Sequence, residues 1–349
     1  MTKTNRTILV SASGSSIGLE VAKSLRLANR AEKIIGTEVS QWGEQLASQF
    51  CDETILVPRG DEAGYQDALR GILVERDVAL AFINTEPELE KIGAISESVA
   101  TIFSCPQGAA LASCLDKSLL HQQLADQQLV AGTRTVTTTA DIAEALTEFG
   151  KPIWLRCAVG PRGRGSIIVE QADEGAAWIE YWRRRGQSQE VWLAHEYLPG
   201  RNLNWTSIWR DGKLVVSSTG ERLKYFLGEV AVSGITGNVS HCRLVNGQEA
   251  NEVATRAIEC LSVPAHGIFS VDLREDRNHV PRVTEINGRN AFRPLLYTQG
   301  GVNFPAILAD VFLDDRAIDL PRYDAGKAGL EMFRGMDFEP LFQQTDLPA

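Results

Sequence analysis

The sequence predicts a mixed fold: an α/β unit with a parallel sheet, a smaller α/β unit, and an α+β region with an antiparallel sheet. Two observations support this prediction. Up to about residue 185, short apolar runs alternate with amphipathic helical segments, as in strands joined by helical crossovers. Beyond residue 190, longer strand-like segments follow one another through hairpin-sized connections at Pro199-Gly200 and Asp211-Gly212.

The first unit is predicted to span residues 1–115. Its apolar run 8–10 is followed by a glycine turn and by apolar residues at helical spacing, which predicts a strand and then a helix. The turn, 14–18, lacks the G-x-G-x-x-G spacing of dinucleotide-binding loops, so we interpret it as a structural turn. Further segments expected in this unit are strands at 33–36, 54–57 and 78–83 and a helix at 65–75.

The second and third units are predicted to span residues 116–190 and 191–349. Asp116 is a suitable N-cap for a helix that reaches about residue 130. The second unit continues with strands at 133–137, 153–157 and 166–170 and with helices opened by Asp141 and covering 172–185. The third unit contains strands at 191–196, 202–209 and 213–219, helices at 247–261 and 303–312, and two strands that flank 275–279.

Composition limits the classes of function. The 349-residue chain has a formal net charge of -10, which disfavours binding to nucleic acid or to an anionic membrane. No stretch approaches the roughly 20 apolar residues of a membrane span, and the N-terminal residues lack the long apolar region of a signal peptide. The 6 cysteines form no C-x-x-C pair. We therefore expect a cytoplasmic protein with reduced thiols and without a nucleic-acid or membrane partner.

The strongest local signal is a pair of strand-like segments that carry Asp272, Glu285 and Asn287. Glu285 and Asn287 are two residues apart, so they project from one face of a strand while Ile286 faces the other way. If the hairpin closes around 278–279, Asp272 lies opposite Glu285. Such an oxygen set suits Mg²⁺, which takes one or two carboxylates together with phosphate and water. The alternative is an ordinary solvated sheet face.

A glycine-rich loop follows the predicted strand that ends near Arg156. Gly163 and Gly165 alternate with Arg162 and Arg164, so backbone N–H groups and positive charge occur together. This composition is typical of a lid over a triphosphate, although a glycine-rich hairpin can also be purely structural.

The order of these parts resembles the ATP-grasp superfamily, in particular single-module proteins similar to one half of a carbamoyl-phosphate synthetase large subunit. Lys117, after Asp116, matches the lysine that binds the nucleotide phosphates, and Arg156 matches the second phosphate-binding cation. Asp272, Glu285 and Asn287 match the metal ligands. The resemblance implies a Rossmann-like first domain, a small α/β lid and a C-terminal antiparallel α+β subdomain.

The same resemblance assigns further residues. Arg289 matches the arginine that stabilises the transferring phosphoryl group, which makes Arg289, Arg156 and Lys117 the implied catalytic residues. The implied nucleotide-binding residues are Lys117, Arg156, Gly163, Arg164, Gly165, Ser166, Glu196, Tyr197, Leu198 and Asn202. Asn202 stands where the family has an acidic ribose ligand, and Gly288 stands where the family has proline.

Substrate contacts are expected from cations and from a small-residue segment. The strand-like segment that carries Glu285 and Asn287 is called the metal strand below. Arg222 and Lys224 lie two residues apart, Ser233 and Gly234 belong to the small-residue segment, and Arg293 follows the metal strand. Arginine holds carboxylates in a bidentate manner, so these cations suit an anionic substrate. The alternative is that they are solvated surface charges.

The resemblance implies an ADP-forming carboxylate–amine ligase that uses ATP and Mg²⁺, with Mn²⁺ as an alternative metal. A carboxylate would be activated as an acyl phosphate and then attacked by an amine, such as that of an amino acid. Phosphorylation of bicarbonate or carbamate is a second interpretation, and a non-catalytic ATP-binding module is a third. The expected partners are small-molecule carboxylate and amine substrates, with a homodimer as the expected assembly.

Overall fold

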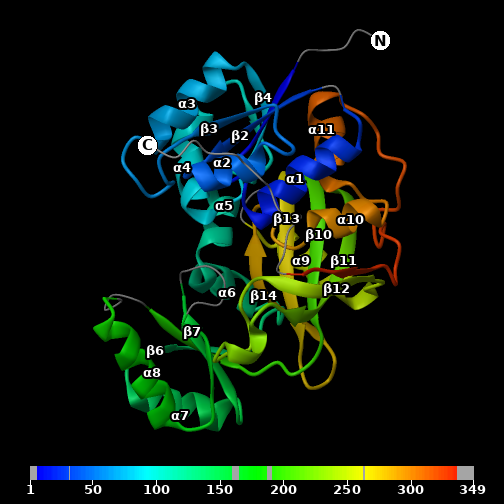
Figure 1. The fold of residues 1–349 in the computed structure, drawn as a ribbon. Helices are drawn as coiled ribbons and strands as arrows, with labels where there is room; N and C mark the ends of the chain where they lie inside the picture. The colour runs from blue at the N-terminus through cyan, green and yellow to red at the C-terminus, as the bar shows by residue number, and fades with distance from the viewer. Residues whose placement is uncertain (1–5, 31, 159–164, 187–190, 262–263, 336–349) are drawn as a thin grey trace.

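The computed structural model describes residues 6–30, 32–158, 165–186, 191–261 and 264–335. These residues form sheets of five, six and four strands. In Figure 1 the five-stranded sheet (blue to cyan) lies at the top, the six-stranded sheet lies below it, and the four-stranded sheet lies at the lower left. The predicted parallel sheet of the first unit and antiparallel sheet of the third unit are confirmed, and the small sheet of the second unit is antiparallel as well. Within the described ranges, no helix is long and apolar enough to cross a membrane.

The five-stranded sheet is parallel and has the strand order β3-β2-β1-β4-β5. Its strands are β1 (Thr7–Val10), β2 (Lys33–Glu38), β3 (Glu53–Leu56), β4 (Val78–Phe82) and β5 (Ile102–Phe103). Its helices are α1 (Ser16–Leu27), α2 (Gln41–Ala47), α3 (Tyr65–Glu75) and α4 (Glu86–Ser96). The sequence did not predict α4. Pro87 lies in the first turn of this helix, where the N–H that proline lacks has no intrahelical partner.

The four-stranded sheet is antiparallel and has the order β6-β9-β7-β8. It consists of β6 (Thr133–Val136), β7 (Ile153–Cys157), β8 (Ile167–Val169) and β9 (Trp192–Glu196), with helices α7 (Thr139–Glu148) and α8 (Ala172–Arg184). Asp141 does not open α7 as predicted. Thr138 is the N-cap, and Asp141 completes a capping box from the third helical position. The predicted domain bounds stay predictions, although β9 extends this sheet beyond residue 190.

The six-stranded sheet has the order β14-β13-β10-β11-β12-β15. Its strands are β10 (Asn202–Arg210), β11 (Lys213–Tyr225), β12 (Val239–Val245), β13 (Gly267–Glu275), β14 (Pro281–Asn287) and β15 (Glu331–Phe333), and a 3-10 turn, η1 (Gly228–Val230), follows β11. Three helices contribute to the hydrophobic core that includes Trp205 and Ile286: α5 (Gly108–Leu115), α6 (Lys117–Ala125) and α9 (Gln248–Glu259). Thus α6, expected to open the second unit, packs against the large sheet instead.

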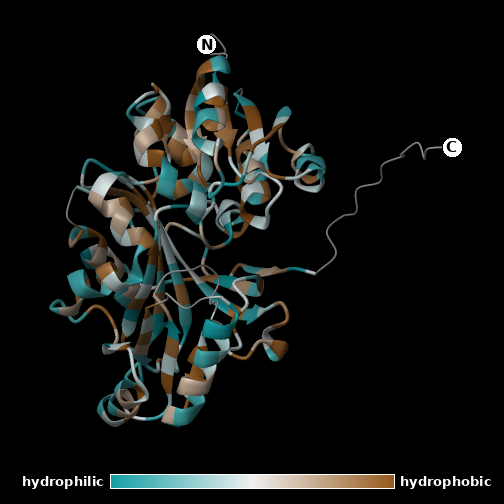
Figure 2. Ribbon diagram, turned by 90° about the vertical axis from the view of Figure 1, so that its left-hand side faces the viewer, coloured by the Kyte–Doolittle hydropathy of each residue, from teal (hydrophilic) through white to brown (hydrophobic). Residues whose placement is uncertain are grey.

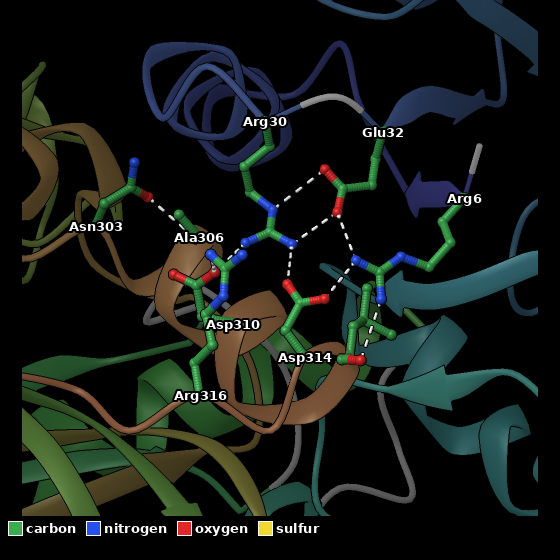
Figure 3. A network of polar contacts seen from close by, with 9 residues as sticks. Arg6, Arg30, Glu32, Asn303, Ala306, Asp310, Asp314 and Arg316 are labelled. Carbon is green, nitrogen blue, oxygen red and sulfur yellow. Dashed lines mark hydrogen bonds and ion pairs between the residues drawn. The ribbon is translucent and has the colours of Figure 1, made fainter. Parts of the chain in front are cut away.

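Helices α10 (Pro294–Gln299) and α11 (Phe304–Leu313) join the large sheet to the first unit. One continuous core contains Val21 of α1, Phe82 of β4 and Phe304 of α11. Hydrophobic residues lie along the central strands in Figure 2, whereas many loops are hydrophilic. At the edge of this contact Arg30 forms ion pairs with Glu32, Asp310 and Asp314, as Figure 3 shows. The first unit is therefore fixed to the large sheet by both apolar and charged contacts.

Candidate functional site

The hairpin of β13 and β14 brings the predicted metal ligands together. Asp272 pairs with Glu285 and Ser270 pairs with Asn287, so the predicted register is confirmed. Ile286 is fully buried in the core on the opposite face. The side chains of Asp272 and Glu285 remain 24% and 22% exposed, so a small ligand can reach both carboxylates.

Asp272 is held in place by side chains from β10 and β11. Its Oδ1 accepts hydrogen bonds from Arg222 at 2.6 Å and from Asn204 Nδ2 at 2.7 Å. Arg222 also stacks on the ring of Phe292, with 5.1 Å from its guanidinium carbon to the ring centroid. Burial lowers the pKa of Arg222, but the charge of Asp272 opposes burial and the net pKa is raised. Arg222 is therefore a permanent cation that supports the Asp272 carboxylate.

Glu285 lies among cations. Lys117 Nζ is 3.6 Å from Glu285 Oε2, and Lys117 is positioned at the first turn of α6 because Asp116 caps that helix. Burial raises the pKa of Glu285, but the charges of Lys117, Arg156 and Arg289 oppose this effect, and the net pKa is lowered. Glu285 is consequently ionised at neutral pH and its negative charge faces several positive charges.

The donor set fits a hard divalent cation that shares its coordination with phosphate. Two carboxylates and the Asn287 amide could supply oxygen ligands, and Mg²⁺ usually completes its octahedron with substrate phosphates and water. In the described part of the chain, no cluster of three or more His, Cys, Asp or Glu residues could hold a metal on its own. The residues thus suit a nucleotide-bound Mg²⁺ better than a metal held by protein ligands alone.

Arg156, in β7 of the four-stranded sheet, contacts β14, the strand that carries Glu285 and Asn287. Its guanidinium donates to the backbone carbonyl of Thr284 at 2.9 Å and, through Nε, to His195 Nε2 at 3.2 Å. Burial lowers the pKa of Arg156, and the charges of Glu285 and Asp272 oppose this. Arg156 therefore lies close enough to the carboxylates of Glu285 and Asp272 to interact with their charges, and its role in phosphate binding stays a prediction. The sequence did not predict a role for His195, because a single histidine in a strand matches no spacing that is typical of ligand residues.

The glycine-rich loop is only partly described. Gly163 and Arg164 lie outside the described residues. Gly165 has a φ of +75° and its carbonyl accepts a hydrogen bond from Trp178 Nε1 at 2.8 Å. Ser166 is 4% exposed, and its Oγ has no hydrogen-bond partner among the described residues. The assignment of Gly165 and Ser166 to phosphate binding stays a prediction.

The predicted nucleotide-binding residues Glu196, Tyr197 and Leu198 lie at the end of β9 and directly after it. Glu196 and Tyr197 are half-buried, and Leu198 is buried. Asn202 donates through Nδ2 to Tyr225 Oη at 2.9 Å and accepts from Arg222 at 3.1 Å. Both ends of the Asn202 amide are therefore engaged within the protein, so its assignment to the ribose receives no support from this geometry and stays a prediction.

Two arginines after β14 are held by carboxylates of the first unit. Arg289 donates to Glu86 Oε1 at 3.2 Å and to the Asn290 carbonyl at 3.2 Å. Arg293 is 3% exposed and forms an ion pair with Glu20 of α1. The buried pair favours a structural role for Arg293 over the predicted substrate contact. Sequence reasoning missed Glu86, although its position just after β4, at the carboxyl edge of a parallel sheet, is a recognisable signal.

The other predicted substrate residues lie around the end of β11. The register shifts between Arg222 and Lys224, so their side chains do not form a matched pair: Arg222 contacts Asp272, whereas Lys224 is exposed. Ser233 and Gly234 lie between η1 and β12, where Ser233 Oγ and Ile235 N are 3.4 Å apart. Their roles as substrate contacts stay predictions.

The glycine turn after β1 is occupied by a carboxylate of the protein itself. Glu38, at the end of β2, accepts a hydrogen bond from Gly14 N at 2.5 Å and from Val39 N at 3.2 Å. A Cβ at Gly14 would lie 2.2 Å from the Gly43 carbonyl oxygen, so the turn needs glycine for close packing. This arrangement favours the structural interpretation of the turn over phosphate binding.

No protein-family model matches the sequence, and a comparison with curated proteins finds no match. The fold, however, is similar to solved structures. A biotin carboxylase from Campylobacter jejuni in complex with β,γ-ATP has a TM-score of 0.72 at 14% identity, covering 93% of this chain and 74% of that chain.

Two further structures of similar fold belong to enzymes with different activities. The N5-carboxyaminoimidazole synthase from Aspergillus clavatus, in complex with ADP and 5-aminoimidazole ribonucleotide, has a TM-score of 0.67 at 16% identity and covers 94% of this chain and 80% of that chain. The L-amino acid ligase from Bacillus licheniformis has a TM-score of 0.64 at 15% identity and covers 89% and 75%. The predicted fold class is confirmed: the chain has an ATP-grasp fold with a Rossmann-like parallel N-terminal sheet.

Proposed function

We propose that the protein is an ATP-dependent ligase that activates a small-molecule carboxylate as an acyl phosphate and joins it to an amine. The observation that carries this proposal is the hairpin pair of Asp272 and Glu285, with Lys117, Arg156 and Arg289 arranged around Glu285. Phosphoryl transfer requires carboxylates that bind a divalent cation and, next to them, permanent cations that bind phosphate oxygens.

In the proposed first step, a carboxylate oxygen of the substrate attacks the γ-phosphorus of ATP in line with the leaving ADP. The new O–P bond forms as the bond to the β-phosphate oxygen breaks, and ADP leaves with that electron pair. Lys117, Arg156 and Arg289 would neutralise charge on the phosphate oxygens, which is the main contribution a protein makes to this reaction. Mg²⁺ held by Asp272, Glu285 and Asn287 would supply additional charge neutralisation at those oxygens.

In the second step, the neutral amine attacks the acyl carbon, phosphate leaves, and the amine proton passes to solvent or to a base. Acyl phosphates hydrolyse in water, so the site must exclude water between the two steps. Substrates that carry both a carboxylate and an amine, such as amino acids, suit a site with this density of cations.

The test is a screen for phosphate release with ATP, Mg²⁺ and pairs of small carboxylic acids and amines. We expect release that depends on one acid and one amine and yields one ADP per amide formed. Release that is independent of any acid, or no release with any pair at saturating MgATP, contradicts a ligase.

Phosphorylation of bicarbonate is a second candidate. It is favoured by fold neighbours such as the biotin carboxylase domain of Hydrogenobacter thermophilus 2-oxoglutarate carboxylase, solved as a dimer with MgADP, ADP and bicarbonate. The same screen with bicarbonate as the acid distinguishes the two candidates. The non-catalytic module is disfavoured, because a protein that only binds ATP needs no cation at the position of Arg289. That dimer also motivates our proposal of a homodimer for this chain.

A further inference from the structure

We infer that His195 is a positioning residue for Arg156, and that Thr133 fixes the imidazole tautomer on which this role depends. His195 contacts the Arg156 guanidinium, and half-buried Thr133 links the buried rings of His195 and His121. The part of this inference that concerns nucleotide binding rests on the proposed function. The part that concerns the tautomer rests on the contacts alone.

The direction of each hydrogen bond follows from Arg156. A guanidinium has only donors, so the 3.2 Å contact from Arg156 Nε to His195 Nε2 requires an unprotonated Nε2. A neutral imidazole then carries its proton on Nδ1, which lies 2.8 Å from Thr133 Oγ1. Thr133 consequently accepts from His195, and its own proton points to His121 Nδ1 or to the Ala131 carbonyl, each at 3.0 Å.

The side chains of His195, Thr133 and His121 come from three elements other than β7, the strand that carries Arg156. His195 comes from β9, Thr133 from β6 and His121 from α6, and the two imidazole rings lie 4.8 Å apart. Both histidines are 5% exposed. A buried side chain with this many neighbours has one orientation, so His195 presents its Nε2 lone pair to Arg156 before any ligand arrives.

The second anchor of Arg156 is on the metal strand. Arg156 Nη2 donates to the carbonyl oxygen of Thr284 at 2.9 Å, and Thr284 directly precedes Glu285. Contacts from β9 on one side and from β14 on the other fix the guanidinium beside the Glu285 carboxylate. Without the His195 acceptor, one N–H of a buried cation loses its partner, which is costly in a low-dielectric environment.

Burial, with a smaller contribution from the surrounding charges, keeps both imidazoles neutral. Burial lowers the pKa of His195 well below its usual value, and Arg156 and His121 add to this effect. Burial also lowers the pKa of His121 to about 3, with contributions from Arg156 and Lys117. The carboxylates of Glu285 and Asp272 face Arg156 from β14 and β13. Neither histidine should therefore titrate between about pH 5 and 8.

Substitutions at His195 and Thr133 distinguish the loss of the hydrogen-bond acceptor for Arg156 from the loss of the imidazole ring. His195→Gln places an amide oxygen near the Nε2 position, whereas His195→Leu keeps a similar volume without an acceptor. Thr133→Ser keeps the hydroxyl and Thr133→Val removes it with little change in shape. His266→Gln is the control, because His266 is 45% exposed and lies on the surface beside Asp211.

Two measurements test the inference. Calorimetric titration with Mg²⁺ and a non-hydrolysable ATP analogue should show at least a roughly tenfold loss of affinity in His195→Leu and less than about a threefold loss in His195→Gln. Thr133→Val should lose affinity and Thr133→Ser should retain it. Equal affinities of His195→Leu and the wild type, or equal losses in His195→Leu and His195→Gln at unchanged melting temperature, overturn the inference.

Nitrogen NMR of the 5 histidines in the unsubstituted protein is the second measurement. We expect His195 to show a protonated Nδ1, a bare Nε2 and no titration between about pH 5 and 8. A protonated Nε2, or titration near the usual histidine pKa, overturns the inference. If the wild type binds no nucleotide, the proposed function fails, and the NMR tautomer alone decides whether His195 positions Arg156.

Discussion

At the scale of single residues, each carboxylate of the candidate site lies next to a cation from another element of the fold. Glu285 has Lys117 at 3.6 Å, and Asp272 has Arg222 at 2.6 Å. Each carboxylate therefore has a cation of the protein as its neighbour when no nucleotide is bound. If a metal–nucleotide complex binds as proposed, its metal ion would face the carboxylates and its phosphates would face the lysine and arginines, so each charge would again have an opposite neighbour.

Glu285→Gln should abolish the ADP release that depends on the carboxylic-acid substrate, because it removes the charge of a proposed metal ligand while keeping the side-chain shape. Its unfolding curve should remain cooperative. Comparison of turnover with that of Glu252→Gln, an exposed carboxylate on α9, provides the control. Turnover of Glu285→Gln equal to that of the wild type rules out the metal assignment.

Arg289→Ala should lower kcat by on the order of 10²-fold, as expected for the loss of one group that stabilises the transition state. A change confined to KM indicates a binding role instead. Because Glu86 contacts Arg289 at 3.2 Å, Glu86→Gln should have little further effect in the Arg289→Ala background. Glu90→Gln, exposed on the same helix, is the matched control.

At the scale of elements, the site depends on close packing between strands and the loop after β14. Gly220 of β11 lies against Phe292, which in turn covers Arg222. A Cβ at position 220 would lie 2.2 Å from Phe292 Cε1, so no side chain fits there without moving the ring. Gly288 is similar: a Cβ there would lie 2.9 Å from Pro106, which gives a physical reason for glycine between Asn287 and Arg289.

Gly220→Ala should destabilise the protein by about 1–3 kcal/mol through overpacking and should also weaken nucleotide binding, because Phe292 leaves Arg222. Gly71→Ala is the matched control: it lies in α3, and a Cβ added there would have nothing within 4 Å, so it should stabilise the helix by about 0.5–1 kcal/mol. Urea unfolding measures both changes. Equal stabilities of the two variants contradict the packing argument.

At the scale of the whole molecule, the parallel sheet is tied to α11 by a charge network around Arg30 (Figure 3). Arg6 adds a second contact to Asp314 at 2.6 Å. Burial raises the pKa of Asp314, but hydrogen bonds from Arg6 and Arg30 oppose it and the net pKa is lowered. The network fixes the first unit, which carries Glu86 and Glu20, relative to the metal strand.

Because the pKa of Asp314 is lower in the folded state, its contribution to stability is present above the usual aspartate pKa and is lost as the pH falls through the folded value. Asp314→Asn should therefore lower the free energy of unfolding by about 1–2 kcal/mol at neutral pH, between the values for exposed and buried pairs. The difference from the wild type should shrink at acid pH. A difference in the free energy of unfolding that stays constant from neutral to acid pH contradicts the charge argument.

The sequence by itself determined the alternation of strands and helices, because periodicity reflects which face of an element is buried. It also determined the pairing of Asp272 with Glu285, since both lie on one short hairpin whose turn sets the register. It did not predict α4, which has Pro87 in its first turn, and it took Asp141 as the start of α7, three residues after the actual N-cap Thr138.

Only the tertiary structure decided which charges meet. Glu86 and Arg289 are 203 residues apart in sequence, and Arg156 and His195 are 39 apart, so no local pattern records their contact. The same holds for Asn202, whose amide looked available for a ligand but is engaged by Tyr225 and Arg222. Local periodicity follows from the geometry of one element, whereas the partner of a buried charge follows from how distant elements pack.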